Sequence, residues 1–291
     1  MAGQRAALSV IIPVRNGAAT IGQQLSALAD ADPPRVMFEV IVADNGSSDE
    51  TASIAASFAR RMRVRVVDAS RRTGANAARN VGVANAEGEW LLFCDADDEV
   101  DRAWLTQMEV AFENGHSLVG GPIDYRELNS PLARSWRGND EETVMTMFGF
   151  LPAAHFANMG MTRATFDRLD GLDESFTHGG DDVELCWRAQ LAGIELHEVP
   201  GAIVNYRLRP SLREHCRQFV HYGTSEVILY RRFKDAGMAR RPLAAAGTDL
   251  WWLFTRLPFA WPIERRGAWL KRLAIEWGRI KGAIRYRTWW W

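Results

Sequence analysis

The segment Trp90-Leu-Leu-Phe-Cys-Asp95-Ala-Asp97-Asp98 decides how this chain is interpreted. Its mostly apolar first half is typical of a short buried strand, and three carboxylates follow within four positions. In open α/β sheets, ligands bind at the carboxyl ends of strands. Clustered carboxylates there repel one another unless a cation or hydrogen-bond donors lie nearby. The segment therefore predicts a strand that ends in a ligand pocket.

Strands and helices alternate before this segment. β-branched runs predict strands at 8–14, 38–43 and 64–68. Helices are expected between them, at 18–29, about 50–60 and 74–86, and the small residues of the last would let it lie close to the sheet. This alternation predicts a parallel α/β sheet with helices on both faces.

The second half of the chain has a different pattern. It contains another acid pair, Asp181-Asp182, after a glycine-rich approach at 176–180. We interpret 126–150, which is mixed and polar, as a mobile loop. The other expected elements are helices at 103–114, 164–169, 183–192 and about 211–235, and strands at 117–125 and 194–199.

Composition limits the class of protein and its compartment. The chain has 291 residues, 47% of them hydrophobic and 24% charged, which is typical of a globular protein. A net charge of −1 gives no indication of nucleic-acid binding. The three cysteines form no CxxC pair, and we find neither a signal region nor an uninterrupted apolar span. We therefore expect a cytoplasmic protein.

The C-terminal residues are unusually basic and aromatic. Residues 256–291 carry nine basic and two acidic side chains, and eight of the 12 tryptophans lie in 251–291. Tryptophan favours the headgroup level of a bilayer, and basic residues favour anionic lipid. Residues 241–291 are therefore predicted to contact the cytoplasmic face of a membrane. Two alternatives remain open: a helix packed on the rest of the chain, or an oligomer contact.

Five motifs occur in a characteristic order: Val10-Ile-Ile-Pro13-Val-Arg-Asn16, Asp44-Asn-Gly-Ser47, Arg79-Asn80-Val-Gly82, Asp95-Ala-Asp97-Asp98 and Gly180-Asp-Asp182-Val-Glu-Leu185. As a set they resemble the family 2 inverting nucleotide-sugar glycosyltransferases. The resemblance implies the GT-A fold, which has a Rossmann-like, mostly parallel sheet flanked by helices, here with a C-terminal helical extension. It divides the chain into a nucleotide-sugar-binding half (1–105), an acceptor-binding half (106–235) and the extension (236–291), which we expect to associate with a membrane.

The same resemblance implies roles on the donor side. Asp44 would hydrogen-bond the base, Asp95 would contact the ribose, and Arg79 would lie near the donor. The residues implied to bind the donor nucleotide are Pro13, Val14, Arg15, Asn16, Asp44, Arg79, Asp95 and Ala96. Asp44 can also be interpreted as an ordinary turn residue before Gly46, and Arg79 as a surface charge.

Asp97 would bind the divalent cation that bridges the diphosphate, either Mn²⁺ or Mg²⁺. A diphosphate leaving group needs its charge neutralised, and both ions prefer oxygen ligands. The alternative is a strand-end turn that needs no metal. Many relatives place a histidine in the segment that corresponds to 203–211, which here has none. We therefore do not expect that segment to supply a metal ligand.

Asp182 matches the family's catalytic base, which would take the proton from an acceptor hydroxyl. Asp181 would contact the acceptor, although the family more often has glutamate there. Either residue could instead cap the helix that follows. Glu184 and Arg188 are expected to form a solvated ion pair. The histidines are assigned ordinary surface or core roles.

These features predict an inverting, metal-dependent hexosyltransferase that uses a nucleoside-diphosphate sugar. The acceptor would carry a hydroxyl, with lipid-linked acceptors of glycolipid or cell-surface polysaccharide synthesis as the expected class. One alternative is a nucleotidyltransferase of related fold, for which Val14-Arg15-Asn16-Gly17 is a poor phosphate loop. The other is a non-catalytic membrane-bound sugar-nucleotide binder, which Asp97 and Asp182 argue against.

Overall fold

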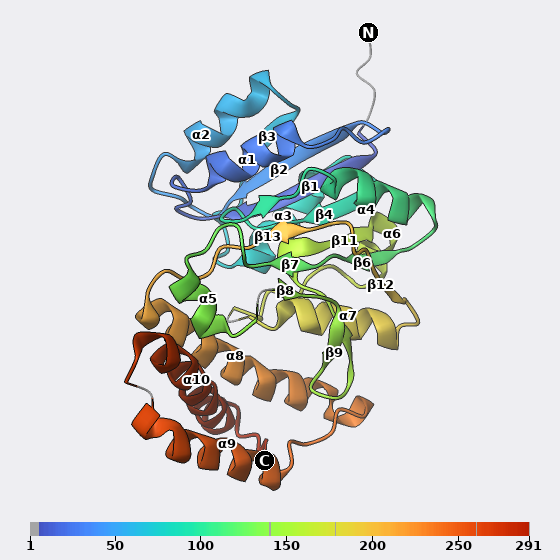
Figure 1. Cartoon of the computed structure of the whole chain (residues 1–291). Helices are drawn as coiled ribbons and strands as arrows, with labels where there is room; N and C mark the ends of the chain where they lie inside the picture. Colours follow the sequence, from blue (N-terminus) through green and yellow to red (C-terminus); the bar gives the residue numbers. More distant parts are fainter. Residues whose placement is uncertain (1–5, 140, 178, 260, 291) are drawn as a thin grey trace.

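The computed structural model describes residues 6–139, 141–177, 179–259 and 261–290. Its main sheet runs in the order β12-β6-β11-β4-β1-β2-β3 (Figure 1). The strands of this sheet are β1 (Leu8–Val14), β2 (Phe38–Asp44), β3 (Val64–Asp68), β4 (Trp90–Phe93), β6 (Leu118–Gly120), β11 (Met159–Thr162) and β12 (Leu196–Glu198).

Most neighbouring strands of this sheet are parallel. β1 pairs in parallel with both β2 and β4, and β2 does so with β3. β11, which the sequence did not predict, is antiparallel to both β4 and β6. The predicted mostly parallel sheet is therefore confirmed, with one reversed strand inserted.

The prediction of one strand at 117–125 is wrong. β6 ends at Gly120, and β7 (Ile123–Asp124) belongs to a second sheet, which it forms with β5 (Glu99–Val100), β13 (Val204–Asn205) and β8 (Glu141–Glu142). Two residues separate β6 from β7. Pro122 has no amide hydrogen to donate, and a Cβ at Gly121 would lie 2.0 Å from the Ala202 carbonyl oxygen.

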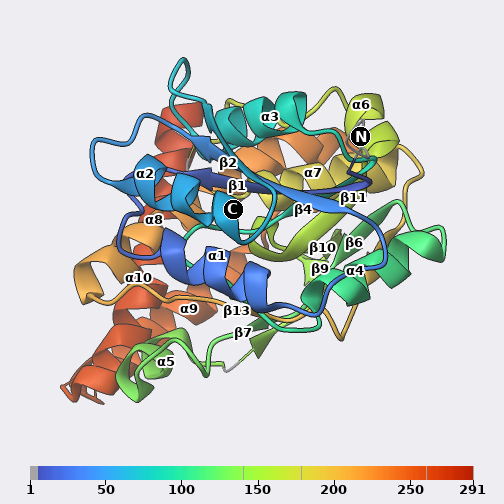
Figure 2. The same cartoon turned by 90° about the horizontal axis from the view of Figure 1, so that it is seen from above.

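Helices cover both faces of the main sheet (Figure 2). On one face, alternate β1 side chains pack with α1 (Ile21–Asp30) and α4 (Trp104–Glu113). The opposite face carries α3 (Ala75–Asn85), where a Cβ at Gly82 would lie 2.5 Å from Ile11 Cγ2. The expected close approach of this helix is thus confirmed. α2 (Thr51–Ser57) and η1 (Phe58–Arg60) lie on the same face as α1, against the β2–β3 end of the sheet.

The segment 126–150 is not the featureless loop that its polarity suggested. It contains α5 (Pro131–Arg137), whose N-terminus is capped by Ser130, together with β8 and β9 (Met145–Met147). β9 pairs with β10 (Leu151–Ala153). η2 (Phe156–Asn158), α6 (Arg163–Arg168) and α7 (Asp181–Leu191) follow.

Glu184 and Arg188 form the predicted ion pair, but the expectation that this pair is solvated is wrong. The Glu184 side chain is 1% exposed, and it binds both Arg188 and Arg232. Arg232 comes from α8 (Leu212–Phe233), which explains the burial because α8 covers this part of α7. The short helix η3 (Lys234–Ala236) follows α8.

The C-terminal extension is helical and gathers with α8 at the end of the molecule away from β1–β3 (Figure 1). It consists of α9 (Leu243–Arg256), η4 (Leu257–Phe259) and α10 (Ile263–Tyr286). α10 packs on α8 so closely that a Cβ at Gly223 would lie 2.1 Å from the Ile275 carbonyl oxygen. Arg279 of α10 also pairs with Glu226 of α8 at 2.7 Å.

One of the two alternatives for the tail, a helix packed on the rest of the chain, is therefore correct for α10. Among the described residues, no helix is both long enough and apolar enough to cross a membrane.

Candidate active site

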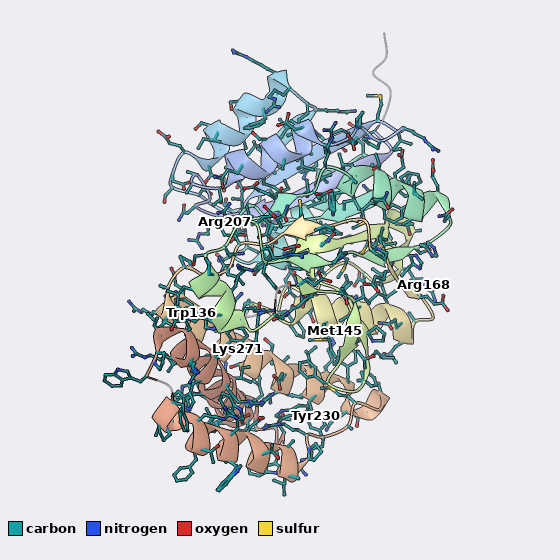
Figure 3. All side chains as sticks on the ribbon, viewed as in Figure 1. Trp136, Met145, Arg168, Arg207, Tyr230 and Lys271 are labelled. Carbon is teal, nitrogen blue, oxygen red and sulfur yellow. The ribbon has the colours of Figure 1, made fainter. Side chains whose placement is uncertain are left out.

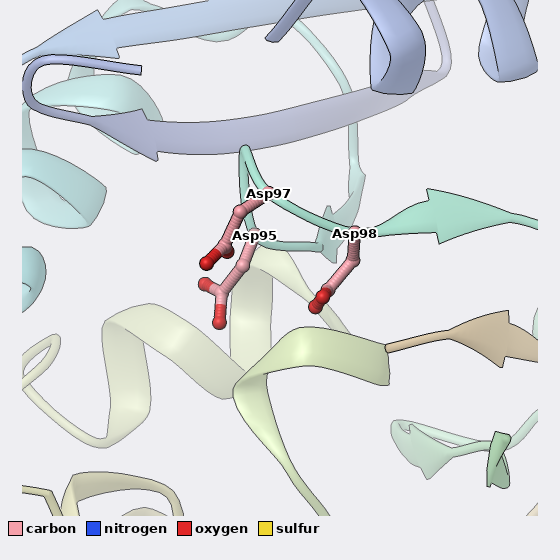
Figure 4. A group of neighbouring side chains, drawn as sticks. All are labelled: Asp95, Asp97 and Asp98. Carbon is pink, nitrogen blue, oxygen red and sulfur yellow. The ribbon is translucent and has the colours of Figure 1, made fainter. Parts of the chain in front are cut away.

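The loop after β4 brings three carboxylates together. Oxygens of Asp95, Asp97 and Asp98 lie within 4.8 Å of one another (Figure 4). Gln24 of α1 holds both ends of this loop, because its amide nitrogen donates to the Asp95 carbonyl at 3.2 Å and its oxygen accepts from Val100 N at 3.0 Å. The loop is thus fixed to the helix beneath it.

Asp98 is fully buried at the base of this acidic loop. Its Oδ1 accepts a hydrogen bond from Arg207 N at 2.8 Å, whereas Oδ2 is buried without a partner among the described residues. Burial, together with the charges of Asp97 and Asp95, raises the pKa of Asp98 well above its ordinary value. Burial also raises the pKa of Asp95, against the opposing effect of Arg79. The loop therefore favours a nearby positive charge.

The segment after β13 supplies that charge. Arg209 Nη1 lies 2.8 Å from Asp97 Oδ2, and Arg207 Nε donates to the Asp97 carbonyl oxygen at 2.9 Å. This is the segment in which the sequence lacks a histidine. Three clustered carboxylates, one of them with an unpartnered buried oxygen, are the hard oxygen donors that Mg²⁺ and Mn²⁺ prefer. The residues present therefore fit a divalent cation, although Arg209 already contacts one oxygen of Asp97.

The residues predicted to bind the nucleoside lie at the neighbouring strand ends. Val14, the last residue of β1, is in register with Asp44, the last residue of β2. Asn16 has a positive φ of 53°, and its side-chain oxygen accepts from Ser48 N at 2.8 Å. Asp44 Oδ1 accepts a hydrogen bond from Ser47 N at 2.9 Å. Asp44 therefore does stabilise the turn, as its alternative interpretation predicted. The other members of this set are half-buried Pro13, exposed Arg15 and buried Ala96.

Arg79 joins the two groups of acids. It projects from α3 and is 4% exposed. Its Nη2 lies 2.9 Å from Asp95 Oδ1, and its Nη1 lies 3.1 Å from Asp181 Oδ2. The guanidinium carbon lies 4.3 Å from the centre of the Phe156 ring. Arg79 is therefore a buried part of the site rather than a surface charge.

Asp181 and Asp182 occupy the first turn of α7, which begins two residues earlier than expected. Neither caps the helix, because the capping position is Gly180, with a φ of +78°. Burial raises the pKa of Asp181 to about 7, with Asp182 adding to the effect and Arg79 opposing it. Asp182 Oδ1 accepts from the adjacent Val183 N at 2.8 Å, which fixes the carboxylate.

His155 lies directly beside Asp182. Its Nδ1 is 3.4 Å from Asp182 Oδ2, and its Nε2 is 3.1 Å from Glu142 Oε2. Burial lowers the pKa of this histidine, but its hydrogen bonds to Asp182 and Glu142 outweigh burial and raise the pKa to about 9. At neutral pH, therefore, a protonated imidazole bridges two carboxylates.

A cavity of about 360 Å³ connects these groups. Arg79, Asp95, Asp181 and Asp182 line one part of it. Side chains of β7, α5, the segment 142–157, α8 and α10 line the remainder, so the C-terminal extension forms part of the wall. Asp95 and the pair Asp181-Asp182 thus face a single space that is large enough for a sugar.

The comparison with known families agrees with this geometry. The family model described as Glycosyl transferase family 2 matches residues 9–170. This chain belongs to glycosyl transferase family 2. It is 29% identical to the glycosyltransferase AglE of Haloferax volcanii, over 96% of each protein. It is also 29% identical to the pre-mycofactocin glycosyltransferase of Mycobacterium tuberculosis, over 92% of this chain and 54% of that protein.

Solved glycosyltransferase structures share the fold. The mannosyltransferase PcManGT from Pyrobaculum calidifontis, in complex with GDP-Man and Mn²⁺, superposes with a TM-score of 0.68 at 19% identity, covering 96% of this chain and 87% of that one. TarS 1–349 from S. aureus, in complex with UDP-GlcNAc, gives 0.54 at 20% identity, covering 96% and 89%. These similarities show the GT-A fold, as the sequence motifs implied.

The motifs of glycosyl transferase family 2 did not reveal three residues of this site. His155 and Glu142 lie outside them, and we had assigned the histidines ordinary surface or core roles. Arg209 is not among the predicted site residues, because the family pattern has a histidine, not an arginine, in 203–211. The available signal was the pair of basic residues in that segment, Arg207 and Arg209. Guanidinium groups can neutralise the carboxylates of a neighbouring acidic loop.

Proposed function

We propose that this chain transfers a hexose from a nucleoside-diphosphate sugar to an acceptor hydroxyl, with inversion at the anomeric carbon. The observation that carries this proposal is the placement of Asp182 in the same cavity as Asp95 and Arg79. A base on the acceptor side and a cation-binding loop on the donor side are what a single in-line displacement needs.

On the donor side, residues 13–16 and Asp44 hold the nucleoside, Asp95 holds the ribose and Arg79 lies beside the sugar diphosphate. Asp97 would hold Mn²⁺ or Mg²⁺, which supplies positive charge to the leaving diphosphate. The PcManGT complex with GDP-Man and Mn²⁺ supports both the donor class and the ion. Residues 1–105 would thus form the donor half and 106–235 the acceptor half.

On the acceptor side, Asp182 takes the proton of the attacking hydroxyl. The new bond joins that oxygen to the anomeric carbon, and the bond from this carbon to the diphosphate oxygen breaks on the opposite face. The hydrogen bond from Val183 N fixes one carboxylate oxygen of Asp182, and His155 pairs with the other. The contact with His155 therefore orients the Asp182 carboxylate. Asp181, held by Arg79, contacts the acceptor.

A thermal-shift screen of nucleoside diphosphates and their sugars, with Mn²⁺ or Mg²⁺, tests the donor assignment. A ligand that binds only the folded state raises the unfolding temperature. With the donor known, the anomeric configuration of the product, measured by NMR, tests inversion. Release of pyrophosphate from a nucleoside triphosphate and a sugar phosphate would instead identify a nucleotidyltransferase. Binding without turnover of any acceptor would identify a non-catalytic binder.

We propose further that the extension (236–291) rests on the cytoplasmic face of a membrane. Large apolar side chains are exposed along α9, along η4 and just before α10, and the most exposed are Leu243, Trp251, Phe254 and Trp261. Arg256, Arg265 and Arg266 lie beside them in the sequence and are exposed or half-buried. Such a face suits a lipid-linked acceptor of glycolipid or cell-surface polysaccharide synthesis.

The structure revises which residues would contribute to membrane binding. Arg272 and Arg279 pair with carboxylates, and Trp290 is buried, so these residues are not available to lipid. Removing the whole extension would also remove the α10 wall of the cavity. Substitution is therefore the sharper test.

Flotation with vesicles of phosphatidylcholine and phosphatidylglycerol should be lost when Trp251, Phe254 and Trp261 are all changed to serine. A matched control replaces three exposed apolar residues elsewhere, Met37, Val110 and Leu191, with serine. If both triple variants float as well as the parent chain, the membrane proposal is wrong.

A further inference from the structure

The part of the cavity away from Asp95 contains two partly buried cations from different elements. Arg137 ends α5, and its side chain is 12% exposed. Lys271 lies on α10 and is half-buried, close to the point where α5 packs on that helix (Figure 3). The two helices meet closely, because a Cβ at Gly267 would lie 2.1 Å from Trp136 Cδ1.

The hydrogen-bonding capacity of these two cations is only partly used. Arg137 Nη2 donates to the Tyr125 hydroxyl at 2.9 Å and pairs with Glu142, whereas its Nε is buried without a partner among the described residues. Lys271 Nζ donates to the Arg137 carbonyl oxygen at 2.5 Å, although an ammonium has three donors. A buried donor without a partner costs free energy, and a ligand oxygen would remove that cost.

The charges are also unbalanced at this end. Glu142 is the carboxylate that Arg137 binds, and it is shared with His155. Lys271 lies 5.1 Å from the Phe219 ring centre, and Arg137 lies 5.5 Å from the same ring. Burial, with a further contribution from Arg137, lowers the pKa of Lys271 to about 8. An anion bound here would balance both cations.

We propose that Arg137 and Lys271 bind a phosphate group of the acceptor while its reacting hydroxyl lies at Asp182. This inference rests on the proposed function and specifies its substrate class. The phosphate binds away from the reacting centre and is not the nucleophile. Binding energy from a non-reacting group can hold the hydroxyl in position at the reacting centre.

The remaining walls indicate what accompanies the phosphate. Apolar side chains line this part of the cavity, including Met147, Phe148, Leu229 and Ile275. Met145, another lining residue, is 44% exposed, so the apolar wall continues to the surface. An acceptor with an apolar portion beside its phosphate fits this lining. Such a phosphate belongs either to a lipid-linked compound or to a soluble sugar phosphate.

The test is calorimetric titration of the full chain with inorganic phosphate. The parent chain should bind it, Lys271→Gln should weaken binding about 10-fold, and Lys271→Arg should restore it. Lys281→Gln is the matched control, because it removes the same charge from an exposed position on the same helix. Equal affinity in all four proteins, or equal loss in both glutamine variants, would overturn the proposal.

A second titration, with citronellyl phosphate, distinguishes the two sources of phosphate. Tighter binding than inorganic phosphate supports a lipid-linked acceptor, and equal binding supports a soluble one. If Lys271 serves only to cap α5, Lys271→Gln lowers the unfolding temperature without changing phosphate affinity, and the proposal fails. Stabilisation of Lys271→Gln by the donor nucleotide is measured in parallel, so a failed phosphate site is not mistaken for a failed transferase.

Discussion

The two groups of carboxylates in the site are paired with different cations: arginines at the loop after β4, and both an arginine and a histidine at the start of α7. Asp97 in the loop after β4 is paired with Arg209, and Asp95 is paired with Arg79. Asp182 at the start of α7 is paired with His155. Arginine stays charged at any physiological pH, whereas histidine can lose its proton.

Under the proposed function, this difference corresponds to two chemical tasks. A diphosphate needs positive charge at all times, both to bind and to leave, and permanent cations suit that task. A base must take up a proton and later release it, and a titratable neighbour lets the local charge follow those steps. Arg79 contacts Asp95 on one side and Asp181 on the other, so it couples the two groups.

The largest effect that separates the two groups is expected from Asp182→Asn. The amide oxygen can still accept from Val183 N, so α7 should keep its first turn, but an amide cannot take a proton. We expect kcat to fall by about 10²–10⁴-fold. Stabilisation by the donor should be unchanged, because the proposed function assigns Asp182 to the acceptor.

Steady-state kinetics and thermal shift on the same samples test this prediction, with Asp235→Asn as an exposed control. Unchanged turnover in Asp182→Asn would show that the base lies elsewhere in the cavity.

The two groups also differ in how well the sequence predicts them. The donor side lies at the ends of β1, β2 and β4, whose apolar runs are unambiguous. Their turns contain short motifs, so the placement of Asp44, Asp95 and Asp97 at one edge of the sheet could be expected from the parallel strands. The close approach of α3 was predictable for the same local reason, since small residues permit it.

The acceptor side depends on contacts between distant residues. Glu142 and His155 come from short strands and loops that carry little periodicity, and they reach Asp182 only through tertiary packing. β11 was missed because Met159–Thr162 lacks a β-branched run, and its pairing with β4 and β6 determines its structure. The wall formed by α10 could not be foreseen, since a basic aromatic helix suits either a membrane or a protein surface.

A smaller effect is expected from Arg209→Gln, which tests the permanent-cation side. Two unit charges about 4 Å apart interact by about 4 kcal/mol at the effective dielectric of a protein surface. Arg209 is 40% exposed, so solvent screens much of this interaction. We therefore expect Arg209→Gln to change the free energy of Mn²⁺ binding by about 1.4 kcal/mol. Removing Arg209 frees Asp97 Oδ2, and Mn²⁺ should then bind about 10-fold more tightly.

Electron paramagnetic resonance of free Mn²⁺ measures this affinity directly. Arg213→Gln on the exposed surface of α8 is the control. Weaker Mn²⁺ binding in Arg209→Gln would mean that Arg209 organises the metal site instead of competing with the ion.

The smallest effect concerns the titratable side, through His155→Gln. The pKa of His155 is about 9 in the folded chain, against an ordinary value of 6.5. Its contribution to stability is therefore fully present below pH 6.5 and is lost as the pH rises through 9. The side chain is 32% exposed and solvent screens its charge, so the contribution to the free energy of unfolding should be about 1 kcal/mol. Urea unfolding should thus show that His155→Gln lowers the free energy of unfolding more at pH 6 than at pH 9.5.

Asp182→Asn provides the internal control for that measurement. It removes one of the two carboxylates that hold the proton on His155. When Asp182→Asn is also present, the loss of unfolding free energy caused by His155→Gln should therefore differ less between pH 6 and pH 9.5. A pH-independent loss in His155→Gln would show that the imidazole contributes packing rather than charge. The contrast between a permanent and a titratable cation would then not explain how the two carboxylate groups are balanced.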